Sequence, residues 1–571
     1  MIRYVALIGA APSGQGPCSS RDWRCVFEDG QTRVHLYGSR DDRLAGYSLA
    51  DGYCIGRTAR RARSSAELAD TWGAYVAISG AADRSIAAVR RDPSGRVPAF
   101  YARTAGGYVV ASHLNDLLAV APISTGIDWD YLTFTLLAGH LPAVHTGLVG
   151  VAEVLPGERL LLQTLEPRST LDWRPSAFYR QSLSPERARS VLRQSAEQAA
   201  CFWAEAYDRI TLDLSGGLDS AVMLGLLARS PARPELTCLN RRTRHSESDE
   251  RRFAREAAAL HGARLLELPI VDEVSEPIHR ELPPRPTFGM LPLGFASASE
   301  AAAQRLGAQA YFTGRGGDHL FFSGTPTSAA ADYLRRTRNP AGLMAIAYRL
   351  ARASGRSIWS VMGQALARPR ADQRLRELTN ENPFLHSEAS ELDITRFIHP
   401  WLLEAADDAP PAKFDQVIAL VELQRHYDRF GRADACDETH PFISQPVIEA
   451  SLATPSELFP AGGRDRGLER EVFCDLIPDS IYRRRSKGGT TSHLVRALVR
   501  NLDWLRPLLL EGELTRRHIL DRARLEAALD RTALLDGRFA ARLVYVVIAQ
   551  MWIDQASQAL SERPQRPGGV R

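Results

Sequence analysis

The sequence contains almost no lysine. Only two of its 71 basic residues are lysine, Lys413 and Lys487, and arginine fills every other basic position. Lys487 lies just after three arginines and one serine in the stretch RRRSKGGTT, residues 483–491. A lysine retained in such surroundings suggests a need for a compact, rotatable point charge, which a planar guanidinium cannot imitate. Chance is the alternative, and this stretch alone does not decide between the two.

Three other features that the sequence lacks exclude classes of function: CxxC pairs, long apolar runs and basic patches. None of the seven cysteines forms a CxxC pair, which argues against structural zinc and favours reduced thiols in a cytosol. No apolar run is long enough to span a membrane. The net charge is only +4, and basic residues are interleaved with acidic ones, unlike the basic patches of nucleic-acid binders. We therefore expect a cytoplasmic protein that binds neither a membrane nor nucleic acid.

The 571 residues are too many for one ordinary domain. Residues 1–180 contain short apolar runs separated by turn residues, which predicts strands. A long helix is predicted to begin after Ser184, the N-cap, with Pro185 as its first residue. We therefore expect a first domain at 1–180, a second at 181–560 and a disordered tail at 561–571.

The second domain alternates between strand and helix patterns, which predicts a parallel, doubly wound sheet. The predicted strands are RITLDL (209–214), ELTCLN (235–240), ARLLELPI (263–270) and AQAYFTG (308–314). After residue 330 the patterns are mostly helical.

The segment LDLSGGLDSA, residues 212–221, joins a predicted strand to a predicted helix through a glycine-rich turn. Two adjacent glycines let backbone N–H groups face one concavity. Together with a helix N-terminus, that concavity favours a phosphate group. The segment is not a Walker A loop, because the distal Gly-Lys-Ser/Thr is missing. An ordinary strand-to-helix turn is the alternative, but such a turn needs one glycine at most.

SGGLDS resembles the pyrophosphate loop of the asparagine synthetase family and its ATP-pyrophosphatase relatives. TGRGGDHLFFSG (313–324) resembles the family's second signature, and ETHPFISQPVIEASLATPSELF (438–459) its Glu-x-Arg-x-Pro-Phe-Leu-Asp segment. SKGG falls where the family carries an essential lysine. Upstream, VRRDPSGRVPAFYAR and GVAEVLPGERLLL resemble the amino-terminal glutaminase-type domain. The likeness covers most of the chain in the right order.

This resemblance implies an α/β protein with two parts. The first is a glutaminase-like (Ntn-type) α/β sandwich. The second is a doubly wound, parallel-sheet ATP-pyrophosphatase synthetase domain with added helices. The implied activity is ATP-dependent amide formation, in which a carboxylate is activated by transfer to AMP and pyrophosphate leaves. Charge then builds up on the phosphates, so such a site needs cations aimed at them.

The resemblance also implies roles for individual residues. Asp219 and Asp318 match the family's magnesium-binding aspartates, so ATP and Mg²⁺ are the expected cofactors. Lys487 would neutralise the departing pyrophosphate or the acyl adenylate. The nucleotide-binding positions implied are Leu214, Ser215, Gly216, Gly217, Asp219, Ser220, Asn240, Thr313, Gly314 and Lys487.

The first domain departs from the family pattern. Glutaminase relatives use a cysteine directly after the initiator methionine, whereas residue 2 here is Ile and no Asn-Gly-Glu pattern is found. Internal cysteines cannot supply the terminal amine that acts as base in that mechanism. We therefore expect a degenerate glutaminase-type domain that makes no ammonia and serves as structural support.

The second departure lies at the acceptor side of the site. Arg315 stands where the family usually has Glu, His319 replaces the next acidic residue, and Ser444 replaces an Asp. Arginine cannot act as a general base, so Arg315 is expected to bind a carboxylate or the adenylate phosphate. His319, Glu438 and His440 are candidate bases, with packing as their alternative role. A peptide α-amine has a pKa of about 7.7–8.0 and makes less demand on a base.

One branch of the family resembles this sequence in both departures: the lasso peptide cyclases, or macrolactam synthetases. They lack the glutaminase cysteine and often show Gly-x-Gly-Gly-Asp-His, as at Gly314–His319. The resemblance implies that an Asp or Glu side chain of a ribosomal precursor's core peptide is adenylated and that the core's N-terminal amine closes the ring. A leader-binding protein and a leader peptidase of the same pathway are then expected partners.

Two alternatives stay open. One is a β-lactam-synthetase-like or asparagine-synthetase-like amide ligase, although β-lactam synthetases usually have Tyr where Arg315 stands. The other is a catalytically degenerate chaperone that only binds a peptide. The intact loop Ser215–Ser220, with Asp318 and Lys487, favours an enzyme.

Overall fold

The structure is a computed structural model, which describes most of the chain. The described residues are 2–9, 22–29, 32–38, 45–80, 87–120, 123–139, 141–162, 166–242, 249–269, 281–291, 295–324, 326–367, 370–379, 382–428, 436–485 and 491–562. Within these ranges, no helix combines the length and the apolar character needed to cross a membrane.

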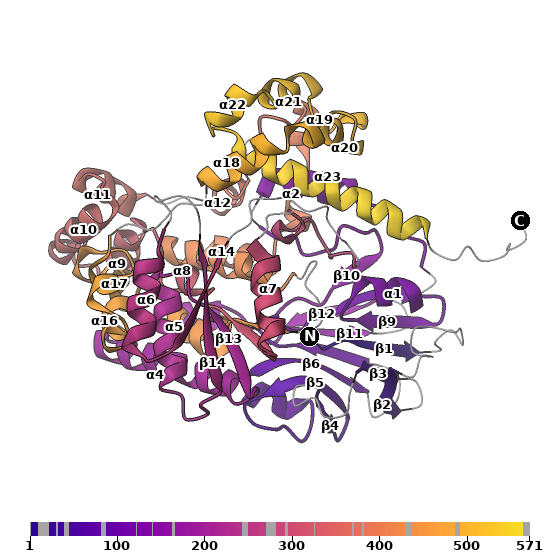
Figure 1. Cartoon of the computed structure of the whole chain (residues 1–571), viewed down its shortest axis with the longest axis horizontal. Coiled ribbons are helices and arrows are strands. Elements are labelled where there is room, and N and C mark those ends of the chain that lie inside the picture. Colours follow the sequence, from indigo (N-terminus) through magenta and orange to yellow (C-terminus); the bar gives the residue numbers. More distant parts are fainter. Residues whose placement is uncertain are drawn as a thin grey trace, which may run out of the picture.

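The N-terminal part consists of two antiparallel sheets (Figure 1). One has the strand order β10-β8-β9-β1-β3-β2 and the other β12-β11-β7-β6-β5-β4. Buried side chains of both sheets, such as Val5 and Val76, belong to one hydrophobic core. The strands are β1 (Tyr4–Gly9), β2 (Trp23–Asp29), β3 (Thr32–Tyr37), β4 (Tyr47–Leu49), β5 (Gly52–Thr58), β6 (Gly73–Gly80), β7 (Ala87–Arg91), β8 (Phe100–Thr104), β9 (Gly107–Ala111), β10 (Val151–Glu153), β11 (Glu158–Leu162) and β12 (Arg168–Leu171). The predicted strands and sandwich are confirmed.

A long helix leads into the C-terminal part. Helix α4 (Pro185–Ala204) begins where the sequence predicts, because the Ser184 side chain accepts a hydrogen bond from the backbone N–H of Arg187 and Pro185 is the first helical residue. Its last turns are buried, and Trp203 donates to the Ser444 hydroxyl at 3.0 Å. Ser444, which stands where the family usually has Asp, therefore has a structural partner.

The C-terminal part is built on a five-stranded parallel sheet in the order β15-β14-β13-β16-β17. The strands are β13 (Arg209–Asp213), β14 (Glu235–Arg242), β15 (Arg264–Pro269), β16 (Ala310–Phe312) and β17 (Asp437–Thr439). Helices α5 (Leu218–Ala228), α6 (Arg251–Leu260) and α7 (Phe295–Arg305) connect the first four. The chain reverses its direction of travel between β13 and β16, which is where doubly wound sheets bind ligands. The predicted sheet is confirmed.

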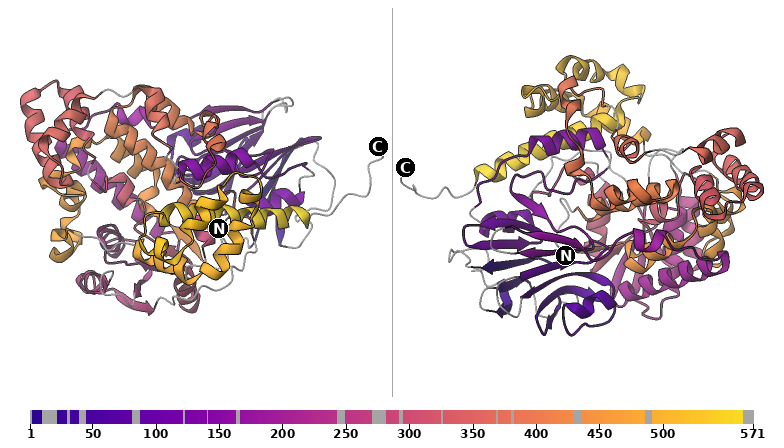
Figure 2. Two further views of the ribbon diagram at one scale, coloured as in Figure 1. Left: turned by 90° about the horizontal axis from the view of Figure 1, so that it is seen from above. Right: turned by 180° about the vertical axis from the view of Figure 1, so that it is seen from behind.

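Helices make up the remaining elements. Helices α10 and α11 lie at the outer edge of the molecule, far from the N-terminal sheets, while α18 to α23 gather above the sheets (Figures 1 and 2). The bounds are α1 (Leu114–Val120), α2 (Trp129–Ala138), α3 (Ser176–Tyr179), α8 (Gly317–Leu320), α9 (Ala329–Thr337), α10 (Pro340–Ser354), α11 (Ile358–Leu366), α12 (Ala371–Arg376), α13 (Pro400–Asp408), α14 (Pro411–Leu423), α15 (Gln445–Ala453), α16 (Gly467–Val472), α17 (Asp479–Arg483), α18 (Thr491–Arg500), α19 (Leu502–Leu510), α20 (Glu513–Arg516), α21 (Arg522–Ala528), α22 (Arg531–Leu535) and α23 (Ala540–Ser561).

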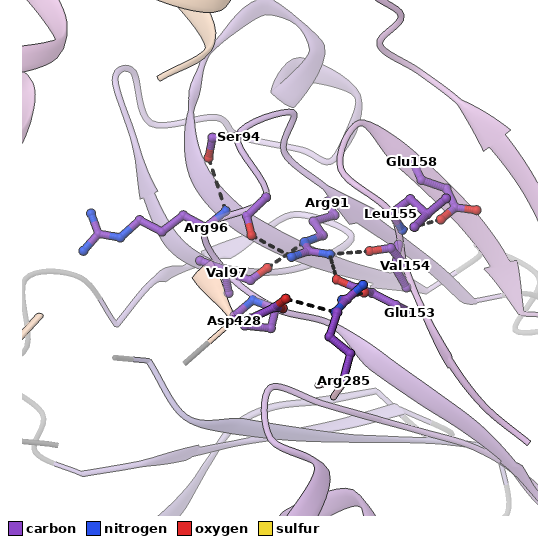
Figure 3. Close-up of polar contacts among 12 residues, drawn as sticks. Arg91, Ser94, Arg96, Val97, Glu153, Val154, Leu155, Glu158, Arg285 and Asp428 are labelled. Atoms are coloured by element: carbon purple, nitrogen blue, oxygen red, sulfur yellow. Dashed lines mark hydrogen bonds and ion pairs between the residues drawn. The ribbon is translucent and has the colours of Figure 1, made fainter. Parts of the chain in front are cut away.

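A buried cluster of charged side chains joins the N-terminal sheets to the C-terminal part (Figure 3). Arg91 Nη1 lies 2.6 Å from Glu153 Oε1, and Arg285 Nε lies 3.1 Å from Asp428 Oδ2. Arg285 also pairs with Glu153. None of these four side chains is more than 8% exposed. Since loss of one partner from a buried ion pair costs about 3–5 kcal/mol, the cluster fastens the two parts together.

Candidate active site at the carboxyl ends of two parallel strands

Two glycine-rich turns lie side by side at one edge of the parallel sheet. The first, residues 214–217, joins β13 to α5, and the second, residues 313–316, joins β16 to α8. Strands β13 and β16 are neighbours, with Leu212 opposite Phe312, so both turns emerge at the same edge. The two segments singled out in the sequence, about a hundred residues apart, therefore form one site.

The first turn can be built only with glycine. Gly216 has φ +91°, in the left-handed region, and a Cβ at this residue would lie 2.6 Å from the carbonyl oxygen of Glu250. Gly217 is the N-cap of α5, so no side chain caps that helix. Ser215 and Ser220 hydroxyls lie 3.1 Å apart at the edge of the turn. Backbone N–H groups at an uncapped helix N-terminus suit an anion such as pyrophosphate.

The second glycine-rich turn packs directly against the N-terminal helical turn of α5, around Asp219. A Cβ on Gly314 would lie 2.6 Å from the backbone of Asp219, and a Cβ on Gly317 would lie 2.5 Å from Asp219 Cγ. Glycine at both positions allows this close approach. The approach brings Asp219 and Asp318, the two predicted magnesium ligands, to the same place.

One arginine lies between these two aspartates. Arg466 Nη1 is 2.7 Å from Asp318 Oδ1 and also bonds Asp219 Oδ1. The same nitrogen lies 3.9 Å from Glu469, whose side chain is fully buried. Burial, reinforced by the nearby Asp219, raises the pKa of Glu469 well above its usual range. The site thus contains two carboxylates that converge on a single cationic atom.

This geometry suits a divalent cation that takes some of its ligands from the protein and the others from the phosphates of a nucleotide. Among the described residues, no group of three or more His, Cys, Asp or Glu side chains could hold a metal by itself. Mg²⁺ prefers six oxygens, and it is commonly held by one or two carboxylates, with phosphate oxygens and water completing the shell. Asp219 and Asp318 supply such a pair, provided that their ion pairs with Arg466 open.

Further arginines surround the pyrophosphate loop. Arg484 donates to the Gly216 carbonyl at 3.2 Å and to Glu250 at 2.5 Å. Beside it is a cavity of about 220 Å³ that begins at Gly217 and Leu218. Its walls carry one carboxylate, Asp465, and the guanidinium groups of Arg352, Arg464, Arg466, Arg470, Arg484 and Arg485. Such a surplus of positive charge suits a polyphosphate.

A second cluster lies on the other side of the second turn. Arg315 Nη1 is 3.1 Å from Glu438 Oε1, and the Thr313 hydroxyl is 2.7 Å from His440 Nδ1. His440 is buried, and its Nε2 lies 3.8 Å from the same Glu438 oxygen. The structure therefore places Glu438 beside two other predicted residues, Arg315 and His440.

Three further residues, His319, Glu422 and His426, extend this cluster. His319 Nε2 lies 3.6 Å from Glu422 of α14. The ring of His426 lies 5.7 Å from the His319 ring and 6.0 Å from the His440 ring. Burial, together with the charges of Arg315 and the other two histidines, lowers the pKa of His426 well below its usual range. His426 is therefore neutral, and its lowered pKa makes it a poor proton acceptor.

Some predicted residues support the site rather than face it. Asn240 is buried, and its side-chain amide donates to the carbonyl oxygen of Leu214 at 2.7 Å, so both residues shape the base of the loop. The predicted Lys487 lies outside the described residues.

Four residues of the site did not stand out in the sequence: Arg466, Arg484, Glu422 and His426. Arginine is too abundant in this chain for any single one to be a signal, and neither Glu422 nor His426 belongs to a recognisable motif.

Comparison with known proteins agrees with this geometry. A family model described as asparagine synthase matches residues 189–554. None of the curated proteins compared with the sequence matches it. Among solved structures, glutamine phosphoribosylpyrophosphate (PRPP) amidotransferase from B. subtilis, complexed with ADP and GMP, is similar over 55% of this chain and 84% of its own. The identity is 13% and the TM-score 0.18, so this likeness carries no argument.

Proposed function

The chain belongs to the asparagine synthase family, and from that premise we propose that this ATP-dependent, amide-forming ligase closes a macrolactam ring in a ribosomal precursor peptide. The carboxylate of an Asp or Glu side chain in the core peptide attacks the α-phosphorus of ATP, and pyrophosphate leaves. The N-terminal α-amine of the same peptide then attacks the acyl carbon. The new amide bond forms, AMP leaves, and one proton passes from the amine to a base.

The observation that carries the proposal is the contrast between the two halves of the site. The half that faces pyrophosphate has an uncapped helix N-terminus, converging Asp219 and Asp318, and an arginine-lined cavity. The acceptor half instead has Arg315, ion-paired to Glu438, where asparagine synthetases usually have Glu. Chemistry on ATP is thus supported, while the nucleophile differs from the one that asparagine synthetases use.

The pyrophosphate half supplies charge stabilisation. Backbone N–H groups of the loop and the guanidinium groups of the cavity are preorganised for the negative charge that develops on the departing phosphates. Asp219 and Asp318 would hold Mg²⁺, which would offset the negative charge of the phosphates. Lys487 is proposed to contribute a further point charge.

The acceptor half is proposed to accept the proton that the attacking amine loses. Arg315 stays protonated and cannot take a proton, whereas Glu438, His440 and His319 are able to. The Arg315 guanidinium can also orient a carboxylate or the adenylate phosphate through paired hydrogen bonds. A peptide amine is already partly neutral near pH 7.5, because its pKa is about 7.7–8.0, so a modest base is enough.

The proposed partners follow from this substrate. They are the precursor peptide itself, together with a leader-binding protein and a leader peptidase of the same pathway, and the proposed location is the cytoplasm. A reading frame of a few dozen residues next to this gene is the source from which to take the peptide for a test.

The test combines two assays on the purified full-length protein. Exchange of labelled pyrophosphate into ATP reports activation of the carboxylate, and loss of one water from the peptide mass reports ring closure. The proposal predicts both with the cognate core peptide, and neither with Asp318→Asn. Exchange that requires free aspartate and yields asparagine with ammonia would instead indicate an ordinary amide synthetase. Peptide binding without exchange would indicate a chaperone.

A further inference from the structure

Helices α10 and α11 lie at the outer edge of the molecule (Figures 1 and 2). They expose several large apolar side chains. Trp359 is 75% exposed, more than any other large apolar residue in the described part of the chain. Leu366 is 68%, Tyr348 60% and Met344 46% exposed. Isolated apolar residues on a surface need no explanation, but these four, called the patch below, lie on two helices that contact each other and point to an interaction site.

The spacing shows that each helix has a satisfied buried side and an unpartnered outer side. Met344 and Tyr348 lie one turn apart on α10, and Trp359 and Leu366 lie two turns apart on α11. The opposite sides bury the residues that hold the helices in place, namely Leu343, Ile346, Ala347 and Leu350 on α10, and Val361 and Ala365 on α11. The exposed residues are therefore not needed for the packing of these helices.

The segment that contains both helices carries charged side chains of one sign only. Residues 333–371 include eight arginines and no Asp or Glu. Arg349, Arg352 and Arg356 form no ion pair with any residue that the structure describes. Elsewhere in this chain arginines are regularly paired with carboxylates. A surface that combines exposed aromatics with unpaired guanidinium groups is complementary to a partner with apolar side chains and carboxylates.

The patch leads to the candidate active site. Arg352 is one turn beyond Tyr348 on the same side of α10, and it lines the arginine-rich cavity together with Arg464 and Arg485. That cavity begins at Gly217, in the pyrophosphate loop. A chain lying along Met344, Tyr348 and Arg352 is thus directed towards the site rather than away from it.

We propose that this outer face of α10 and α11 docks an acidic, amphipathic segment of the polypeptide substrate, at a distance from the residues that react. The apolar side chains of the segment pack on Tyr348 and Trp359, and its carboxylates pair with Arg349, Arg352 and Arg356. The assignment of the partner as the substrate rests on the proposed function. The docking surface and its preference for acidic partners are argued from exposure and charge alone and do not rest on it.

A binding assay without ATP tests the surface by itself. The probe is a short, fluorescein-labelled peptide with Glu along one helical face and Leu and Phe along the other, and its counterpart has Lys in place of each Glu. Fluorescence anisotropy with the full-length protein should show binding of the acidic peptide only. The double variant Tyr348→Ser, Trp359→Ser should weaken this binding at least about tenfold, as expected for loss of aromatic anchors. Trp504→Ser, an exposed tryptophan on α19, is the matched control and should change nothing.

Three results would overturn the proposal. The first is equal binding of the acidic and the basic peptide, and the second is unchanged affinity in the double variant. The third is tight binding to phosphatidylserine vesicles that the double variant abolishes, which would make the patch a membrane-binding surface. Circular dichroism of each variant confirms that it is folded.

A further assay connects the surface to the substrate. If the proposed function is right, the double variant should raise KM for the precursor peptide about tenfold and leave kcat unchanged, because the patch does not touch the reacting atoms. Failure of ring closure in the wild-type protein would contradict the proposed function and leave the binding result standing.

Discussion

Arg466 Nη1 lies 2.7 Å from Asp318 Oδ1, and the same nitrogen bonds Asp219. One guanidinium therefore pairs with both of the carboxylates that are proposed to hold Mg²⁺ and offsets half of their charge. Arg466 also contacts Asp465, with Nε 3.2 Å from Oδ2, and lies near Glu469. When the aspartates bind a metal, Arg466 still has these other partners. The arginine and the proposed metal would thus compete for the same oxygens.

Arg466→Gln should lower stability and make it depend on Mg²⁺. Arg466 is 5% exposed, so its removal leaves Asp219 close to buried Glu469 without a cation, at an expected loss of about 3–5 kcal/mol in the free energy of unfolding. Mg²⁺ can replace the missing charge, so it should raise the Tm of the variant more than that of the wild type. Thermal unfolding with and without Mg²⁺ measures this difference.

The control is Arg483→Gln, because Arg483 forms an exposed pair with Asp479 and should matter little. If Mg²⁺ shifts the Tm of Arg466→Gln no more than that of the wild type, the two aspartates are not metal ligands.

Lys413 should make stability depend on pH. It is fully enclosed and donates to Gln416 Oε1 at 2.9 Å and to the carbonyls of Leu452 and Thr454 at 2.7 and 2.6 Å. Burial lowers its pKa to about 7, although the Asp332 carboxylate opposes this shift. In the unfolded chain the pKa is about 10.4. Between these two values the unfolded chain binds more protons than the folded one, so the free energy of unfolding rises with pH.

The measurement is urea unfolding of the wild type and of Lys413→Met from pH 6.5 to pH 9.5. The difference between them should shift in favour of the wild type as the pH rises, by on the order of 3 kcal/mol across the window. Parallel pH profiles for the two proteins would show that Lys413 stays protonated in the folded state, held by its three acceptors.

Arg315→Gln should separate the two half-reactions. Its guanidinium pairs with Glu438, whose side chain is only 8% exposed, and both lie on the acceptor side of the site. Ring closure should fall by about a hundredfold, the usual effect of disturbing a general base, while pyrophosphate exchange is largely retained. Rapid-quench kinetics with the cognate peptide can follow both steps.

Arg33→Gln is the control, because Arg33 forms an exposed pair with Glu28 in the N-terminal sheets, and it should leave both half-reactions unchanged. An equal loss of exchange and ring closure in Arg315→Gln would place Arg315 in adenylation instead.

The features that local sequence encodes were predictable. Ser184 and Pro185 predict the start of α4, because a capping hydroxyl and a proline are both favoured at the N-terminus of a helix. The glycines of the two turns mark close backbone approaches that no other residue permits. The alternation of strands and helices was enough for the parallel sheet.

What depended on long-range contacts was not predictable. Arg466 reaches Asp219 across almost half of the chain, and nothing in its local sequence distinguishes it from the other arginines. Strand β17 has only three residues and exists as a strand because it pairs with β16. His426 belongs to a three-histidine cluster that forms only when the turn after α14, the helix after the second glycine-rich turn and the end of β17 come together.

The last prediction concerns Lys487, which lies outside the described residues. Arg484, three residues earlier in the sequence, donates to the Gly216 carbonyl, so the described chain reaches the pyrophosphate loop just before this position. Six arginines already line the cavity beside that loop. A seventh guanidinium would therefore add charge that the site already has. A lysine adds something different, a compact ammonium on a flexible stem that can follow the phosphate as it leaves.

Lys487→Arg and Lys487→Ala should consequently both be folded and slow. Loss of one charge-assisted contact to a developing phosphate charge costs on the order of 3 kcal/mol, or roughly a hundredfold in rate. The defect should appear in single-turnover ring closure with the cognate peptide, more than in ATP binding. Arg485→Lys is the control, because it alters the neighbouring charge without removing it, and its effect should be mild. A near-normal rate for Lys487→Arg would mean that any cation serves here and that the lysine is an accident of composition.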